Sequence, residues 1–157
     1  MLEHTPLSWP PTPNPAVERT LRMKPRKAAH FYVGRHRRGR EMHQGIYDRL
    51  IELARALPGR LTTYSDIAPL AGLSMNNDAD RDRISTLLGE ILLHEVNQGR
   101  PLLTAIVVHR GNDNNPGEGF FSIATDIGRF NGSRDPLARL EFWVRQVQEV
   151  HSYWAAH

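Results

Sequence analysis

Apolar residues recur at helical spacing in three separate stretches of the chain. In residues 41–57 they stand three or four positions apart with charged residues between them: Met42, Ile46, Leu50, Ala54 and Leu57. In residues 80–97 they form a second stripe: Ile84, Leu87, Leu88, Ile91, Leu92 and Val96. After Asp135-Pro136 they form a third: Leu140, Trp143, Val144, Val147, Val150 and Trp154. This spacing predicts three amphipathic helices, each with one buried face.

A short fourth helix is predicted between the first two. Pro58-Gly59 ends the first helix, and Thr63 to Asp66 has the form of a capping box that begins a new one. Pro69 removes a backbone donor inside this segment, so we expect about two turns or a kink before Gly72.

The continuous apolar run Leu102–Val108 predicts a buried strand. The glycine- and asparagine-rich residues 111–117 then predict a loop, and order resumes at Gly119. Helix, short helix, turn, longer helix, strand and loop is the order of a winged helix-turn-helix. We therefore expect an α+β fold, a mostly helical single domain with a winged helix-turn-helix core over residues 41–157.

Residues 1–40 differ from this domain in composition. Five prolines and no apolar period in residues 1–22 predict a disordered or extended arm, and Met23 is a possible natural start. The arm holds nine Lys/Arg against two acids, a net charge of +7, whereas residues 41–157 hold eleven against fifteen, or −4. A local basic cluster suffices to attract phosphate, but a solvated tail is the competing interpretation.

The composition excludes several classes of functional site. The chain has no cysteine, which excludes disulfides, thiolate metal sites and thiol nucleophiles and suits a reducing compartment. No apolar run is long enough for a membrane span. We expect a cytoplasmic, soluble protein with no membrane partner, no cofactor and no metal.

Two motifs resemble the C-terminal domain of alkylguanine-DNA alkyltransferases and alkyltransferase-like proteins. Residues 58–68, Pro-Gly-Arg-Leu-Thr-Thr-Tyr-Ser-Asp-Ile-Ala, resemble the family's Pro-x-Gly-x-x-x-Tyr-Gly-x-Ile-Ala motif. Residues 100–110, from Arg-Pro to His-Arg, resemble its Asn-Pro-x-Pro-Ile-x-Ile-Pro-Cys-His-Arg motif. Gly119 and Phe121 stand where the family has a Gly and a Tyr. The resemblance covers about residues 41–121.

The resemblance implies a DNA-binding function in repair or regulation. It assigns Tyr64 to a nucleotide phosphate and Arg83, or less readily Arg81, to insertion into the base stack, beside a pocket of Val108, His109 and Phe121. Val108 replaces the acceptor cysteine, so alkyl transfer is excluded. We therefore predict a non-catalytic binder of duplex DNA, with Arg110 also at the duplex and the arm arginines on phosphates: Arg35, Arg37 and Arg38.

Two other functions remain open. His109 and Glu118, on or beside the loop with Arg110 and Asp113, could serve an enzyme as general base and partner, although a structural histidine anchoring the strand end is the simpler interpretation. Glu90 and His94 could bind a metal with a third ligand, but an exposed polar face is simpler. Aromatic residues crowd the last helix and could cap the core or form a homodimer contact: Phe142, Trp143, Tyr153 and Trp154.

Overall fold

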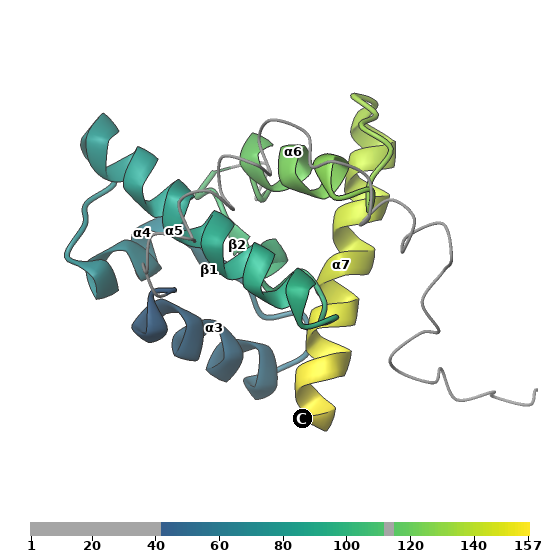
Figure 1. The fold of residues 1–157 in the computed structure, drawn as a ribbon, viewed down its shortest axis with the longest axis horizontal. Helices are drawn as coiled ribbons and strands as arrows, with labels where there is room; N and C mark the ends of the chain where they lie inside the picture. Colours follow the sequence, from purple (N-terminus) through teal and green to yellow (C-terminus); the bar gives the residue numbers. More distant parts are fainter. Residues whose placement is uncertain (1–41, 112–114) are drawn as a thin grey trace, which may run out of the picture.

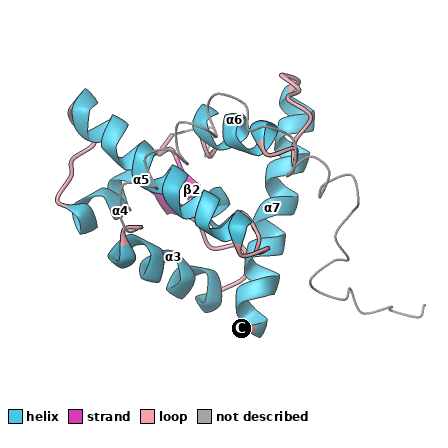
Figure 2. Ribbon diagram, viewed as in Figure 1, coloured by secondary structure: helices cyan, strands magenta, loops and turns pink. Residues whose placement is uncertain are grey.

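The computed structural model describes residues 42–111 and 115–157, and these are mostly helical with one small sheet (Figures 1 and 2). The elements follow in the order α3 (Gln44–Ala56), β1 (Thr62–Thr63), α4 (Tyr64–Ile67), η1 (Ala68–Ala71), α5 (Asp78–Asn97), η2 (Leu103–Ile106), β2 (Val107–Val108), α6 (Glu118–Asp126) and α7 (Pro136–Ala156). The expected mostly helical α+β fold is confirmed. The basic arm, with Met23, Arg35, Arg37 and Arg38, lies outside the described residues.

Helix α3 confirms the first predicted helix and corrects its ends. His43 caps it, because its Nδ1 accepts a hydrogen bond from the Ile46 amide at 3.1 Å. Ile46, Leu50 and Ala54 of the predicted stripe are buried. Leu57 was expected on that stripe but is 59% exposed, because the helix ends at Ala56 and the chain is extended from there.

The predicted short helix is α4 followed by the 3₁₀ turn η1. The Thr63 hydroxyl accepts a hydrogen bond from the Asp66 amide at 3.2 Å, which confirms the predicted N-terminal cap. The helix tightens to 3₁₀ geometry at Pro69, where the proline has no amide to donate. Gly72, in the left-handed conformation at φ 69°, then turns the chain toward α5.

Helix α5 has its whole predicted apolar stripe buried, from Ile84 to Val96. Asn77 caps its start by accepting from the Asp80 amide at 2.8 Å. Figure 1 shows α5 lying across the small sheet, with its first turns projecting away from α7. Helix α5 from Ile84 onward is therefore held in the body of the molecule, and its first turns extend from it.

The prediction of one strand over Leu102–Val108 is wrong. Leu103–Ile106 form the 3₁₀ helix η2, and only Val107–Val108 form strand β2. The reason is the length of its neighbour, since β1 offers two residues for pairing: Thr62 with Val107 and Thr63 with Val108, in parallel. The buried backbone groups just before β2 form hydrogen bonds within their own turn instead. For example, the Ala105 amide donates to the Leu102 carbonyl at 2.9 Å.

Order after the loop resumes as helix α6, which the sequence pattern did not indicate. In the described part of the chain both strands belong to the one parallel pair, so these residues contain no β-hairpin. Helix α6 buries Phe120, Phe121 and Ile123. The segment that follows β2 and the loop is thus a helix packed near α5, and the winged form of the core stays a prediction.

Helix α7 begins at Pro136 under the Asp135 cap, as predicted, but its buried face differs from the expected stripe. The buried residues are Phe142, Gln146, Val150, His151 and Trp154. Leu140 and Val144 were expected inside but are 51% and 40% exposed. Packing of α7 against α3 and η2 selects the face, and Trp143 joins it by donating from Nε1 to the Ala105 carbonyl at 2.8 Å. None of the helices in the described ranges is long and apolar enough to cross a membrane.

Candidate nucleic-acid interface

A hollow of about 160 Å³ lies between helix α5, the start of α6 and Tyr64. Its walls include Tyr64, Arg81, Ser85, His109, Gly117 and Glu118. Of the predicted pocket residues Val108, His109 and Phe121, only His109 lines it. Val108 is 3% exposed on β2 and paired with Thr63, and Phe121 packs on Phe142 and Phe130. Val108 thus belongs to the buried strand β2, whereas His109, the next residue after the strand, has an exposed side chain.

The side of this hollow is built by Tyr64 and His109. Their rings stack with centroids 4.5 Å apart, and the Tyr64 hydroxyl donates to the Pro116 carbonyl at 2.6 Å. Burial raises the pKa of Tyr64 to about 12. The His109 amide donates to the Asn115 carbonyl at 2.9 Å, but its side chain is exposed. His109 therefore secures the strand end through its backbone and leaves its ring at the surface.

Gly117 allows this stack to form. Its φ is +81°, a conformation that other residues rarely adopt, and a Cβ atom placed there would stand 2.5 Å from His109 Nε2. Any side chain at position 117 would displace the imidazole or the loop. Glycine at this position thus sets the shape of the hollow.

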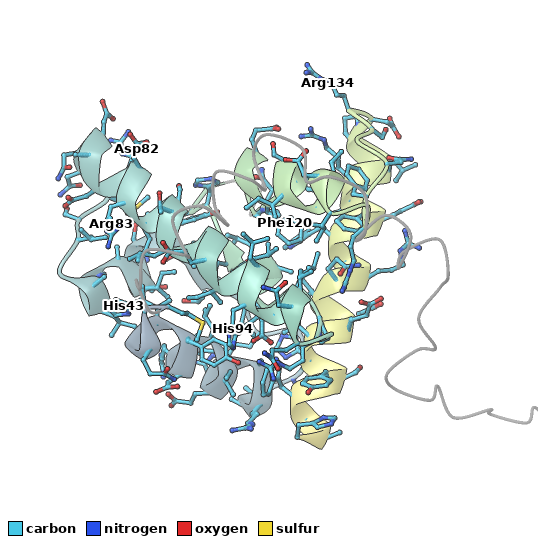
Figure 3. All side chains as sticks on the ribbon, in the orientation of Figure 1. His43, Asp82, Arg83, His94, Phe120 and Arg134 are labelled. Carbon is cyan, nitrogen blue, oxygen red and sulfur yellow. The ribbon has the colours of Figure 1, made fainter. Side chains whose placement is uncertain are left out.

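Of the predicted DNA-contacting arginines among the described residues, only one lines the hollow. Arg81 lines it and is held by Asp78 at 3.1 Å and by the Met75 carbonyl, to which its Nε donates at 2.8 Å. Arg83 is exposed on the projecting half of α5, near Asp82 (Figure 3). Arg110 is 3.9 Å from Asp66, and both are largely exposed. A surface pair at that distance leaves the Arg110 guanidinium available to a phosphate.

Glu118, the predicted partner of His109 in an enzyme, shares the hollow with it. Its carboxylate is bound by Arg139 through two hydrogen bonds, at 2.6 and 3.2 Å. The hydrogen bonds from Arg139 lower the pKa of Glu118 below its ordinary value. Glu118 is therefore held as a carboxylate by Arg139, which makes it a poor proton donor.

The prediction of an exposed polar face at Glu90 and His94 is wrong. Glu90 is only 3% exposed, and His94 is half-buried with its ring edge-on to Tyr47 at 5.5 Å. The Nε2 atom of His94 is 3.3 Å from the Arg100 guanidinium. In the residues that the structure describes, no group of three His, Asp or Glu side chains is placed to hold a metal ion.

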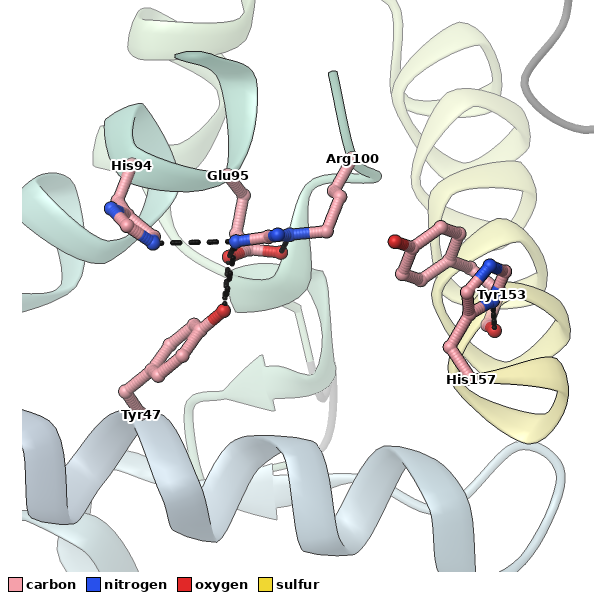
Figure 4. Close-up of polar contacts among 6 residues, drawn as sticks. All are labelled: Tyr47, His94, Glu95, Arg100, Tyr153 and His157. Carbon is pink, nitrogen blue, oxygen red and sulfur yellow. Dashed lines mark hydrogen bonds and ion pairs between the residues drawn. The ribbon is translucent and has the colours of Figure 1, made fainter. Parts of the chain in front are cut away.

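A buried ionic cluster that was not predicted from the sequence is formed by Tyr47, Glu95 and Arg100 (Figure 4). Glu95 is fully buried, accepts from the Tyr47 hydroxyl at 2.7 Å and receives Arg100 at 2.9 and 3.0 Å. Burial, and next the hydrogen bond to Glu95, raise the pKa of Tyr47 above its ordinary value. The sequence contained a signal for the burial of Glu95, because this residue stands on the apolar stripe, four residues after Ile91 and seven after Leu88.

The aromatic residues of α7 largely cap the core. Phe142 and Trp154 are buried, and the guanidinium groups of Arg55 and Arg100 lie 5.4 and 5.8 Å from the Trp154 ring centroid. The exposed apolar residues of α7 are aliphatic and stand in one row: Leu137, Leu140 and Val144.

Comparisons with protein-family models, with curated proteins and with solved structures find no match to this chain. The resemblance of its motifs to the alkyltransferases therefore stays a prediction. The function has to be inferred from the side chains of this chain.

Proposed function

We propose that this protein binds duplex DNA without catalysis, in the manner of alkyltransferase-like proteins. In this proposal α4, η1 and α5 are a helix-turn-helix within a winged core, and α5 enters the major groove. The observation that carries the proposal is the mostly exposed start of α5, residues 78–83, which follows the turn at Gly72 and lines one hollow with Tyr64 through Arg81. In such a motif the start of the second helix contacts base edges while neighbouring segments contact phosphates.

The side chains suit different parts of a duplex. Arg83, exposed on α5, is the candidate for the bases, whereas Arg110 and Tyr64 are candidates for phosphate oxygens. The single hydroxyl proton of Tyr64 is already shared with the Pro116 carbonyl. A phosphate would therefore exchange one acceptor for another, with a small net effect on affinity.

The start of α5 carries a net negative charge, so most of the attraction to phosphate has to come from another segment. Residues 78–83 hold three acids and two arginines, a net charge of −1. The arm of residues 1–40, at +7, is the only strongly basic segment of the chain. We therefore expect α5 to supply orientation and the arm to supply most of the salt-dependent affinity.

Fluorescence anisotropy of a labelled duplex, titrated with the full chain at several salt concentrations, tests the proposal. Replacing Arg83 with Gln should weaken binding about tenfold. The matched control Arg145→Gln, an equal charge change on α7, should leave affinity within about twofold, as for a remote surface charge. Deleting residues 1–40 should reduce the slope of log K against log salt by several units. Absence of binding to both plain and alkylated duplex at low salt would refute the proposal.

A second candidate function is protein binding through α7. It is favoured by the exposed row of Leu137, Leu140 and Val144, since aliphatic side chains in one row on a helix are suited to a second apolar surface. A homodimer through this row should dissociate in the Leu140→Glu variant, as measured by sedimentation velocity.

An enzyme that uses His109 and Glu118 is favoured only by their shared hollow. Removing Arg139 by Arg139→Gln should raise the pKa of Glu118 and reveal any such activity.

A further inference from the structure

Helix α6 begins at the hollow without a side-chain cap. It packs beside α5 (Figure 1), and residues 118–120 of its first turn line the hollow. Gly117 stands at the N-cap position and has no side chain that could accept their hydrogen bonds, while its own amide donates to the Asn115 side chain at 3.0 Å. The space beside Gly119 is open, since a Cβ atom there would meet no atom within 4 Å. Uncapped amides at the positive end of a helix attract an anion.

The hydroxyl of Thr104 indicates a polar ligand independently of the helix. Thr104 belongs to η2, is only 5% exposed and lines the same hollow. Its Oγ1 atom makes no hydrogen bond to another described residue and is not sealed from solvent, so the hydroxyl opens onto the hollow. A hydroxyl in so buried a place costs free energy unless water or a ligand bonds to it.

Helix α5 adds two further donors on the opposite wall. Ser85 lines the hollow, and its hydroxyl has no partner among the described residues. Arg81 uses Nε for the Met75 carbonyl and Nη1 for Asp78, which leaves Nη2 without a bond to the described residues. One guanidinium nitrogen and one hydroxyl are therefore available to a ligand from this side.

The charge of the hollow is also suited to an anion. Among the described residues Glu118 is the one acid that lines it. The carboxylate of Glu118 is bound by Arg139, which lies outside the hollow and lines the neighbouring groove with Trp143. Arg139 thus neutralises the one negative charge of the wall, and the positive charge of Arg81 is left to attract a ligand.

The size of the hollow limits what can enter it. At about 160 Å³ it is smaller than the roughly 300–1,000 Å³ of pockets that enclose a whole ligand, so only the end group of a molecule fits. A phosphate monoester is such a group, with three acceptor oxygens and a charge between about −1.5 and −2. An internal phosphate of a nucleic acid carries a sugar on both sides and cannot enter end-on. A carboxylate has only two oxygens and would leave more of the donors unused.

We propose that the hollow binds a phosphate monoester, whose oxygens accept from the amides of residues 118–120 and from the hydroxyls of Thr104 and Ser85. The 5′ end of a DNA strand and a free nucleotide both present this group. The inference does not rest on the proposed DNA binding, because the internal phosphates of a duplex would be contacted outside the hollow.

NMR titration of the isotope-labelled full chain with inorganic phosphate, at constant ionic strength, tests the site. The amide resonances of Gly119 and Phe120 should shift and saturate, with half-saturation at about 1 mM. Thr104→Val keeps the shape of the side chain and removes the hydroxyl, so it should weaken binding about fivefold. Ser85→Ala, at an exposed position that the fold does not need, should weaken it by a similar factor. The matched control is Thr86→Val, whose hydroxyl donates to the Asp82 carbonyl outside the hollow, and it should change binding less than about twofold.

The same titration with a deoxynucleoside 5′-monophosphate, and with a duplex that carries or lacks a 5′-phosphate, identifies the source of the group. A saturating shift from either monoester supports the proposal. Shifts that grow linearly with phosphate would overturn it, as would Thr104→Val and Ser85→Ala variants that bind as tightly as Thr86→Val. A response to inorganic phosphate but to neither monoester would also overturn it. Failure of the unphosphorylated duplex to bind would refute only the proposed DNA binding.

Discussion

Glu90 and Glu95 stand five positions apart on helix α5 and are both almost completely buried, yet their surroundings differ. Glu95 points into the body and is bound by Tyr47 and Arg100. Glu90 is 3% exposed, and its Oε1 has no hydrogen-bond partner in the described residues. Burial alone therefore does not define the role of a charge. The partner does, because an ion pair holds the fold together, whereas a buried carboxylate without a partner costs free energy.

The two sites should differ most in how far the free energy of unfolding falls when the negative charge of the glutamate is removed. Glu95→Gln should lower the free energy of unfolding by about 3 kcal/mol, because it leaves Arg100 without its anion in a mostly buried position. The lower end of the usual range applies, since the Arg100 side chain is 21% exposed and partly solvated. Urea denaturation measures the change. A loss under about 1 kcal/mol would show that solvent compensates Arg100.

Alkaline titration of Tyr47 and Tyr64 separates the effect of Glu95 on a tyrosine pKa from the effect of burial. Burial raises the pKa of Tyr64 to about 12, and Glu95 adds to burial at Tyr47. A raised folded pKa stabilises the protein fully below the unfolded value near 10, and this stabilisation is lost as the pH rises through the folded pKa. For Tyr64 the loss amounts to roughly 2 kcal/mol between pH 10 and 12.

Phenolate absorbance against pH, with and without Glu95, measures the two tyrosines. Glu95→Gln should lower the pKa of Tyr47, since it removes the charge and weakens the hydrogen bond, and should leave that of Tyr64 in place. Glu90→Gln should move neither pKa. If both tyrosines shifted together in Glu95→Gln, the variant would have loosened the whole fold.

A smaller loss is expected when the hydroxyl of Tyr47 is removed. Tyr47→Phe deletes the hydrogen bond to Glu95 and the one that the hydroxyl accepts from Arg100 Nη2 at 3.1 Å. Both oxygens of Glu95 stay bound to Arg100, so we expect a loss of about 1.5 kcal/mol. The double variant with Glu95→Gln should lose clearly less than the sum of the single losses, because the residues share one network. Additive losses in urea would argue against a shared network.

The smallest effect is expected at Glu90. Glu90→Gln removes a charge that has no described partner, so the free energy of unfolding should change by less than about 1 kcal/mol in either direction. Glu141→Gln, at an exposed position of α7, is the matched control. A loss comparable with that of Glu95→Gln would mean that Glu90 has a strong partner already in the folded body.

The sequence predicted the elements whose local signals and packing agree. The stripe from Ile84 to Val96, the Thr63 cap and the interruption at Pro69 were all recognisable, because each depends on neighbours within one or two turns. The run Leu102–Val108 was mistaken for a strand, since a short apolar run has no period that distinguishes a strand from a buried turn. Helix α6 was missed because glycines and a proline surround its start.

The candidate site was predictable only in part. The closeness of His109 and Glu118 followed from the chain itself, and the structure adds Tyr64 from a distant segment. The burial of Glu90 and of Gln146 in place of Val144 could not be read from local pattern. Both depend on which surface covers a helix, and this is decided by tertiary contacts.

The two-residue ladder of β1 and β2 has a consequence for how the chain folds. It joins residues 62 and 107, which are 45 positions apart, and α4, η1 and α5 all lie between them. Closing so long a loop costs chain entropy that two strand pairs cannot repay, so the ladder should form only after α5 has docked. Any opening that undocks α5 should therefore also expose the amide protons of this ladder, so they should be no better protected from exchange with solvent than the amide protons of α5.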